Sequence, residues 1–117
     1  MTNTKISAFI NEPHLSADLA KVCNNNGYSI HFPESIDDLN TSNYVLIDLD
    51  DKSLNPYKIS IDLKKKSVAV FGLVNRLNKT IQGNANKSGI DLVFPKSLFC
   101  SNLVSIINQI EINKKKQ

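Results

Sequence analysis

The sequence predicts an α/β fold in which a single parallel sheet is covered by helices on both faces. The main observation is a pair of apolar runs, residues 44–47 and 68–74, that do not alternate with polar residues. Continuous runs of this kind are typical of strands buried on both faces. Parallel strands need crossover connections, and segments with helical spacing separate the runs. With 117 residues, the chain is expected to form one domain over residues 1–117.

The first strand and the first helix are predicted from the beginning of the chain. Residues 5–10 (KISAFI) form a strand that ends before Pro13, and proline is well suited to the first turn of a helix. In the helix that follows, apolar residues recur at i, i+4, i+7 and i+8, namely Leu15, Leu19, Val22 and Cys23. Gly27 is expected to end this helix, because glycine readily adopts the left-handed closing conformation.

The middle of the chain contains the central strand and one ambiguous segment. Residues 28–32 alternate and indicate a half-buried edge strand, residues 35–39 form a short helix at most, and residues 44–49 form the central strand. Residues 56–66 alternate as a strand would, yet Asn55 and Pro56 resemble a helix start. We expect a helix there, because buried parallel strands need a covering crossover.

The last third of the chain supplies two more strands and two more helices. Strand 68–74 is followed by a polar segment, residues 75–88, with a thin apolar stripe at Leu77, Ile81 and Ala85. Strand 91–94 precedes a final helix with Leu103, Ile106, Ile107 and Ile110 on one face. Residues 111–117 are expected to form a disordered basic tail.

The predicted elements repeat a strand–helix unit five times. Such a repeat specifies a doubly wound sheet, and the strand order expected is 2-1-3-4-5. The alternating strand 28–32 fits an edge of this sheet, and the apolar strands 44–49 and 68–74 fit its centre.

Composition excludes several classes of function. No apolar run has the length of a membrane span, and no signal peptide is expected, so the protein is placed in the cytoplasm. Cys23 and Cys100 lack metal-site spacing and are expected to be reduced core thiols. His14 and His31 have no serine or cysteine placed beside them, so no enzymatic activity is expected. A net charge of +3 with one arginine does not predict a nucleic-acid partner.

Asp48 is the principal candidate for a functional residue. It lies where the central strand should end, and ligands in open parallel sheets bind beyond the carboxyl ends of the strands. The alternative interpretation is that Asp48, Asp50 and Asp51 simply begin a polar loop.

The chain resembles the receiver domains of bacterial two-component signalling, which have the flavodoxin-like strand order. The resemblance rests on three stretches: residues 12–15 (EPHL), residues 43–49 (NYVLIDL) and residues 89–96 (GIDLVFPK). It implies that Asp48 occupies the position of the phospho-accepting aspartate, a nucleophile toward a phosphoryl group. It also implies that Lys96 contacts the phosphoryl oxygens and that acidic side chains after the first strand hold a divalent cation.

Several positions depart from the receiver pattern. The acidic pair falls on Ile10 and Asn11, and Glu12 compensates only if the loop shifts by one residue. The switch hydroxyl falls on Gly72 and the switch aromatic on Val93. Metal binding is therefore not expected; any metal would be held by Asp48 and Glu12. Ser97 stands where receivers carry a cis proline, so the bond after Lys96 is expected to be trans.

The leading hypothesis is a stand-alone receiver-like adaptor, or pseudo-receiver, that acts by protein–protein contact without phosphorylation-driven switching. Asp48 and Lys96 would then form a structural salt bridge. The partner would be a histidine kinase, an output protein or a second copy, bound around residues 75–88 and 95–102. The alternative is a response regulator phosphorylated on Asp48 with Mg²⁺ and Lys96. A third hypothesis is a flavin- or nucleotide-binding protein, although residues 11–14 lack a phosphate-binding loop. No cofactor is expected under the leading hypothesis.

Overall fold

The computed structural model describes residues 4–39, 43–66 and 68–115. Five parallel strands form one sheet with the order β2-β1-β3-β4-β5, which confirms the predicted fold class and topology. The strands are β1 (Lys5–Phe9), β2 (Ser29–His31), β3 (Tyr44–Asp48), β4 (Ala69–Val74) and β5 (Leu92–Pro95). The central strand β3 is buried along its whole length, as its continuous apolar sequence predicts.

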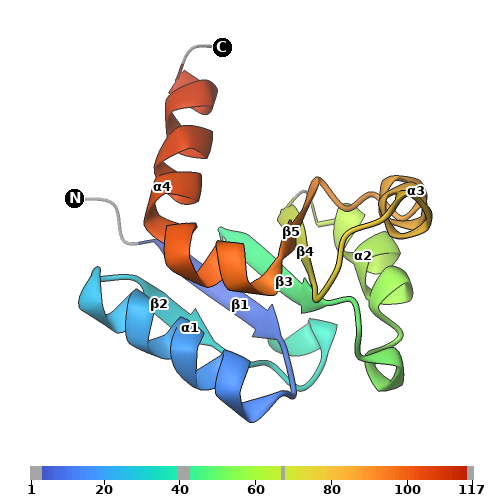
Figure 1. Ribbon diagram of the computed structural model, residues 1–117, viewed down its shortest axis with the longest axis horizontal. Coiled ribbons are helices and arrows are strands. Elements are labelled where there is room, and N and C mark those ends of the chain that lie inside the picture. Colours follow the sequence, from blue (N-terminus) through green and yellow to red (C-terminus); the bar gives the residue numbers. More distant parts are fainter. Residues whose placement is uncertain (1–3, 40–42, 67, 116–117) are drawn as a thin grey trace.

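Helices cover both faces of the sheet (Figure 1). The four α-helices are α1 (Pro13–Asn25), α2 (Pro56–Lys64), α3 (Lys79–Lys87) and α4 (Lys96–Lys115). Helices α1 and α4 pack on one face, in a core that contains Leu19, Phe71 and Phe99. Helices α2 and α3 cover the other face through Leu63 and Ala85. Each face of the sheet therefore has its own hydrophobic cluster.

The helical segment of residues 56–64 settles the ambiguity of that stretch. Its buried residues are Pro56, Ser60 and Leu63, which lie at i, i+4 and i+7 as a helix requires. The buried Ser60 hydroxyl donates a hydrogen bond to the carbonyl of Ser88 at 2.9 Å. Ile61, in contrast, is 51% exposed. The strand-like alternation arose because a serine faces inward and an isoleucine faces outward.

The structure differs from the sequence predictions in the number of α-helices, in the start of α3 and in the placement of Leu77. The second connection contains only the short 3₁₀ helix η1 (Ile36–Asp38), so only four of the five units have an α-helix in the described residues. Helix α3 begins at Lys79 rather than at residue 75, because the side chain of Asn78 caps it by accepting a hydrogen bond from Ile81 N. Leu77 precedes this cap and is exposed instead of facing the core.

The C-terminal helix is longer than predicted and is kinked. Helix α4 continues to Lys115, so the stretch expected to be a disordered tail is helical up to that residue; residues 116–117 lie outside the described part. Asn102 has non-helical dihedral angles (φ −122°, ψ 16°) and divides the helix into two segments. The second segment extends beyond the sheet (Figure 1). Among the described residues, no helix is both long and apolar enough to cross a membrane.

Candidate functional site: a crevice at the carboxyl ends of the strands

Asp48 and Lys96 meet in the crevice beyond the carboxyl ends of the strands. Asp48 is the last residue of β3 and is only 3% exposed, and Lys96 directly follows β5. The Lys96 Nζ atom lies 3.0 Å from Asp48 Oδ1. The sequence placed both residues at this edge, and the structure brings them together. The peptide bonds of the described residues are all trans, as expected for the bond after Lys96.

Asp50 is a member of this site that the sequence interpretation assigned to the polar loop. Its Oδ2 atom lies 3.0 Å from Lys96 Nζ and accepts a hydrogen bond of 2.7 Å from Asn75 N. Its own backbone N–H donates to Asp48 Oδ1 at 3.0 Å. The carboxylate of Asp50 thus contacts the segments that follow β4 and β5. We call Asp48, Asp50 and Lys96 the crevice triad.

The triad determines the charge state of Lys96. Burial by itself would lower the pKa of the Lys96 ammonium, because an apolar environment disfavours the charged form. Hydrogen bonds and Coulomb attraction from Asp48 and Asp50 act in the opposite direction and together raise the pKa above its ordinary value. Lys96 is therefore a permanent cation at neutral pH, shared by two carboxylates.

Asp51 and Asn11 form the rim of the crevice. Asn11 Nδ2 donates a hydrogen bond to Asp51 Oδ2 at 3.1 Å, which links the segment after β1 to the segment after β3. Asp51 also caps the 3₁₀ helix η2 (Lys52–Leu54) by accepting from Ser53 N at 3.1 Å. The hydrogen bonds from Ser53, followed by those from Asn11 and the charge of Lys96, lower the pKa of the Asp51 carboxyl.

The residues at the acidic-pair positions have structural roles. Ile10 is 7% exposed and belongs to the core between the sheet and helices α1 and α4. Glu12 is the N-cap of α1: its carboxylate accepts hydrogen bonds from His14 N, at 3.3 Å, and from Leu15 N. Both oxygens of Glu12 are thus engaged with the backbone of its own helix.

The donor set was tested against the needs of Mg²⁺, which binds near-octahedrally to carboxylates and water. Asn11, Glu12, Asp48, Asp50 and Asp51 line a cavity of ≈ 390 Å³. However, the single cation Lys96 pairs with both Asp48 and Asp50, and Glu12 caps α1. Within the described ranges, no three His, Cys, Asp or Glu side chains converge on a metal position. The residues in this arrangement do not fit Mg²⁺.

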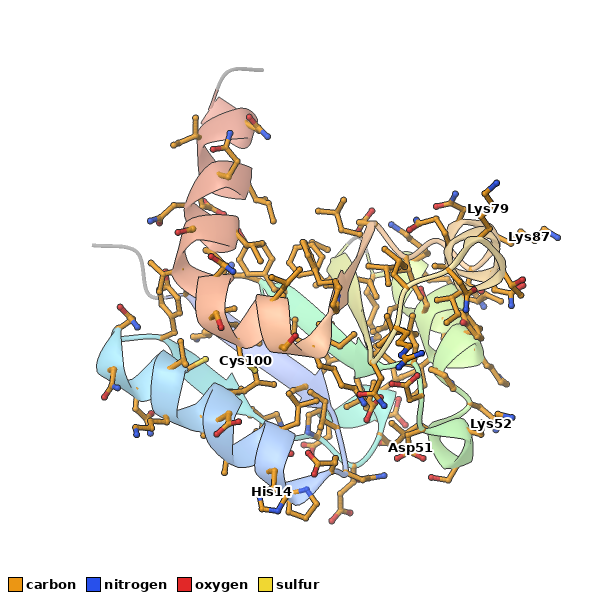
Figure 2. The ribbon with its side chains drawn as sticks, viewed as in Figure 1. His14, Asp51, Lys52, Lys79, Lys87 and Cys100 are labelled. Carbon is orange, nitrogen blue, oxygen red and sulfur yellow. The ribbon has the colours of Figure 1, made fainter. Side chains whose placement is uncertain are left out.

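A second cavity of ≈ 600 Å³ adjoins the triad on the side of α1 and α4. Glu12, His14 and Asp18 contribute to it from α1 and the preceding loop, and Lys96 and Cys100 from α4. Figure 2 shows His14 at the start of α1 and Asp51 across the same end of the sheet. Burial raises the pKa of the Cys100 thiol, and the charge of Asp18 adds to this effect. Cys100 is therefore a thiol rather than a reactive thiolate at neutral pH.

Comparison with known proteins identifies the fold. A receiver-domain protein of Methanospirillum hungatei superimposes with a TM-score of 0.81 at 11% identity, covering 98% of both chains. The Vibrio cholerae chemotaxis protein CheY4 matches with a TM-score of 0.80 at 8% identity, covering 92% of this chain and 98% of that one. An orphan response regulator of H. pylori matches with a TM-score of 0.69 at 15% identity, over 87% and 94% of the two chains.

The chain has the fold of a response-regulator receiver domain. No protein-family model and no curated protein sequence matches the chain, so the likeness is one of structure. The five strands and their order are those of the receiver fold, whereas the residues of the crevice differ from the pattern that the sequence resemblance implied.

The two switch positions inferred from the receiver resemblance lie away from the crevice. Gly72 is inside β4, two residues before its end, and pairs with Ile47 and Val93. Val93 is buried in the cluster beneath α2 and α3. The residue that reaches the crevice from the end of β4 is Asn75, through its backbone N–H. The strand thus continues for two residues beyond Gly72, to Val74.

Proposed function

We propose that this protein is a receiver-like signalling module that acts by protein–protein contact and is not switched by phosphorylation. The observation that carries the proposal is the crevice triad, in which Lys96 is held between Asp48 and Asp50 at 3.0 Å from each. A carboxylate engaged in this way, beside a buried Ile10, is suited to a structural role. The two free cysteines favour a reducing compartment such as the cytoplasm.

The proposed partner face consists of the ends of β4 and β5, helix α3 and the first turns of α4. Three of the large apolar side chains that remain exposed lie in this part of the chain: Leu77 (44%), Leu92 (44%) and Leu98 (56%). In this proposal a partner covers these exposed apolar side chains and removes them from water. The partner is a signalling protein, namely a histidine kinase or an output protein, or else a second copy of the chain.

The alternative function is that of a response regulator phosphorylated on Asp48. The cavity of ≈ 390 Å³ that borders Asp48 favours this alternative, since it leaves space beside the carboxylate. A flavin- or nucleotide-binding role is disfavoured, because Glu12 already occupies the N-terminal amides of α1 that would bind a phosphate.

Thermal unfolding with and without Mg²⁺ and beryllofluoride, an aspartyl-phosphate mimic, tests the proposal. A ligand that binds only the native state must raise the midpoint of unfolding. We expect neither the wild type nor Asp48→Asn to shift. A rise in the midpoint of the wild type that is absent from Asp48→Asn would overturn the proposal and establish the phosphorylated alternative.

A further inference from the structure

Charge is strongly segregated along the chain. Residues 1–51 contain two lysines and eight acidic residues, a formal charge of −6. Residues 52–96 contain nine lysine and arginine residues but only two aspartates, a formal charge of +7. The net charge of +3 for the whole chain conceals this asymmetry. Because the basic part includes both α2 and α3, it covers one face of the sheet (Figure 1).

Both aspartates of the basic part are already paired. Asp62 lies 3.3 Å from Lys58 Nζ, and Asp91 lies 2.9 Å from Lys64 Nζ. Lys96 points into the crevice triad. Among the described residues of this basic part, 52–66 and 68–96, six exposed cations then remain without an ion pair: Lys52, Lys65, Lys66, Arg76, Lys79 and Lys87. We call these six residues the basic surface.

Most of the basic surface belongs to α2, α3 and the segments beside them: Lys65 and Lys66 directly follow α2, and Lys79 and Lys87 are the first and last residues of α3. Figure 2 shows Lys79 and Lys87 projecting outward from α3, and Lys52 on the same flank beside α2. Between its two lysines, α3 exposes Thr80, Asn84 and Asn86, while Ala85 is buried. This helix therefore presents cations, amides and a hydroxyl, with no acidic side chain and no fully exposed apolar one.

The composition of α3 indicates which class of polyanion fits. Interfaces between proteins depend on a few large apolar, aromatic or arginine anchors, and α3 exposes none. Contacts to nucleic-acid phosphates come instead from lysine, arginine, threonine and asparagine side chains and from helix N-termini. We infer that the basic surface binds the phosphate backbone of double-stranded DNA. With one arginine available, these are contacts to phosphates rather than to base edges.

This inference goes beyond the proposed function and rests on other observations, since no member of the crevice triad belongs to the basic surface. The basic surface shares only α3, through Lys79 and Lys87, with the proposed partner face. The argument from sequence against a nucleic-acid partner used the net charge of the whole chain. The field near a surface depends on local charge, and most acidic residues belong to the other part of the chain; of these, Asp37 lines a cavity together with Lys65 and Lys66.

Fluorescence anisotropy with a labelled 20-base-pair duplex of mixed sequence tests the inference on the full chain. We expect wild-type binding that weakens between 50 and 200 mM salt, with a slope of log K against log salt of about −4 if most of the six cations contact phosphates. An absence of binding at the lowest salt concentration would overturn the inference.

Matched variants locate the site. Lys87→Gln removes a cation from the basic surface, and Lys21→Gln removes one exposed helical lysine from α1. We expect Lys87→Gln to weaken binding about three- to tenfold and to reduce the slope by about 0.9, and Lys79→Gln/Lys87→Gln to have a larger effect. Lys21→Gln is expected to bind as the wild type does, and equal weakening by both single variants would overturn the inference.

Two further measurements complete the test. In a competition assay, poly-glutamate of matched charge and unlabelled duplex are each used to displace the labelled duplex. If poly-glutamate displaces the labelled duplex as strongly as unlabelled duplex does, the inference is overturned and the surface is assigned to an acidic protein. Asp48→Asn is measured alongside and is expected to leave duplex binding unchanged. A positive beryllofluoride result would therefore refute the proposed function without affecting this inference.

Discussion

Lys96 Nζ lies as close to Asp50 Oδ2 as to Asp48 Oδ1, at 3.0 Å from each. The lysine of the receiver fold is therefore the centre of a three-membered ion cluster in this protein. Removing Lys96 would leave two carboxylates without their shared cation in a crevice where Asp48 is almost completely buried, whereas removing either aspartate leaves the other paired with Lys96.

Lys96→Met is expected to reduce the free energy of unfolding by about 2–4 kcal/mol, because two carboxylates would lose their shared cation. Urea unfolding measures the change. Lys21→Met, an exposed helical lysine, is the control and is expected to change stability by less than about 0.5 kcal/mol. Adding Asp48→Asn to Lys96→Met should recover part of the loss; a double variant less stable than Lys96→Met would contradict this account.

Stability should also fall at alkaline pH through Lys96. Its pKa is raised in the folded state, so its contribution is complete below the unfolded value of 10.5 and is lost as pH rises through the higher folded value. Unfolding free energies of the wild type and Lys96→Met, measured from pH 8 upward, should therefore converge as the lysine deprotonates. A difference that stays constant over this range would show that Lys96 does not act through its charge.

The carboxyl of Asp51 is expected to make stability fall at acidic pH. Its pKa is lowered in the folded state by Ser53, Asn11 and Lys96. Its contribution is therefore present above the unfolded value of 3.8 and is lost as pH falls through the lower folded value. Asp51→Asn should flatten the fall in stability below pH 4, as measured by thermal unfolding at successive pH values. If Asp51→Asn leaves the fall in stability below pH 4 unchanged, a group other than Asp51 is responsible for it.

Gly72→Ala is expected to destabilise the protein by about 1–3 kcal/mol. A Cβ atom on Gly72 would lie 2.6 Å from Leu49 Cδ1, and Leu49 is buried. Gly83→Ala is the matched control, because a Cβ there would meet nothing within 4 Å. In a helix interior this second substitution should stabilise by about 0.5–1 kcal/mol. The double variant Gly72→Ala/Leu49→Ala tests the clash. Its loss of unfolding free energy should be smaller than the sum of the losses of the two single variants.

Tyr44→Phe is expected to loosen the projecting segment of α4. The Tyr44 hydroxyl donates a hydrogen bond to the Glu111 carboxylate, which joins the start of β3 to the last turns of α4. We expect a loss of about 1–2 kcal/mol and faster amide hydrogen exchange over residues 103–115. Tyr28→Phe is the comparison, since the Tyr28 side chain packs at the edge of the same core. Equal rates of amide hydrogen exchange in Tyr44→Phe and Tyr28→Phe would contradict the idea that the Tyr44 hydroxyl anchors α4.

The fold was predictable because its signals are spread over many residues. The continuous burial of β3 and β4 follows directly from their apolar sequences, and the edge position of β2 from its alternation. The convergence of Asp48 and Lys96 also followed from topology, since parallel strands end at one edge of the sheet.

The other parts of the site depend on single contacts that leave no periodic signal. Asp50 joins the triad because the chain turns after β3, so that Asp50 N returns to Asp48 Oδ1. The start of α3 depends on which of two asparagines, Asn75 or Asn78, provides the N-cap. Because both are asparagines, their intrinsic preference for the N-cap position is the same. Glu12 is the exception: Pro13 marks the first turn of a helix and so places the preceding residue, Glu12, at the N-cap.

The carboxylate of Asp50 also governs how the crevice opens. It belongs to the segment after β3, accepts the backbone N–H of Asn75 after β4 and holds Lys96 after β5. Three connecting segments thus meet at one acceptor group, and the segment after β3 cannot move outward without breaking its contacts to the other two. Outward movement of the segment after β3 would therefore release Asn75 and leave Lys96 with its contact to Asp48 alone.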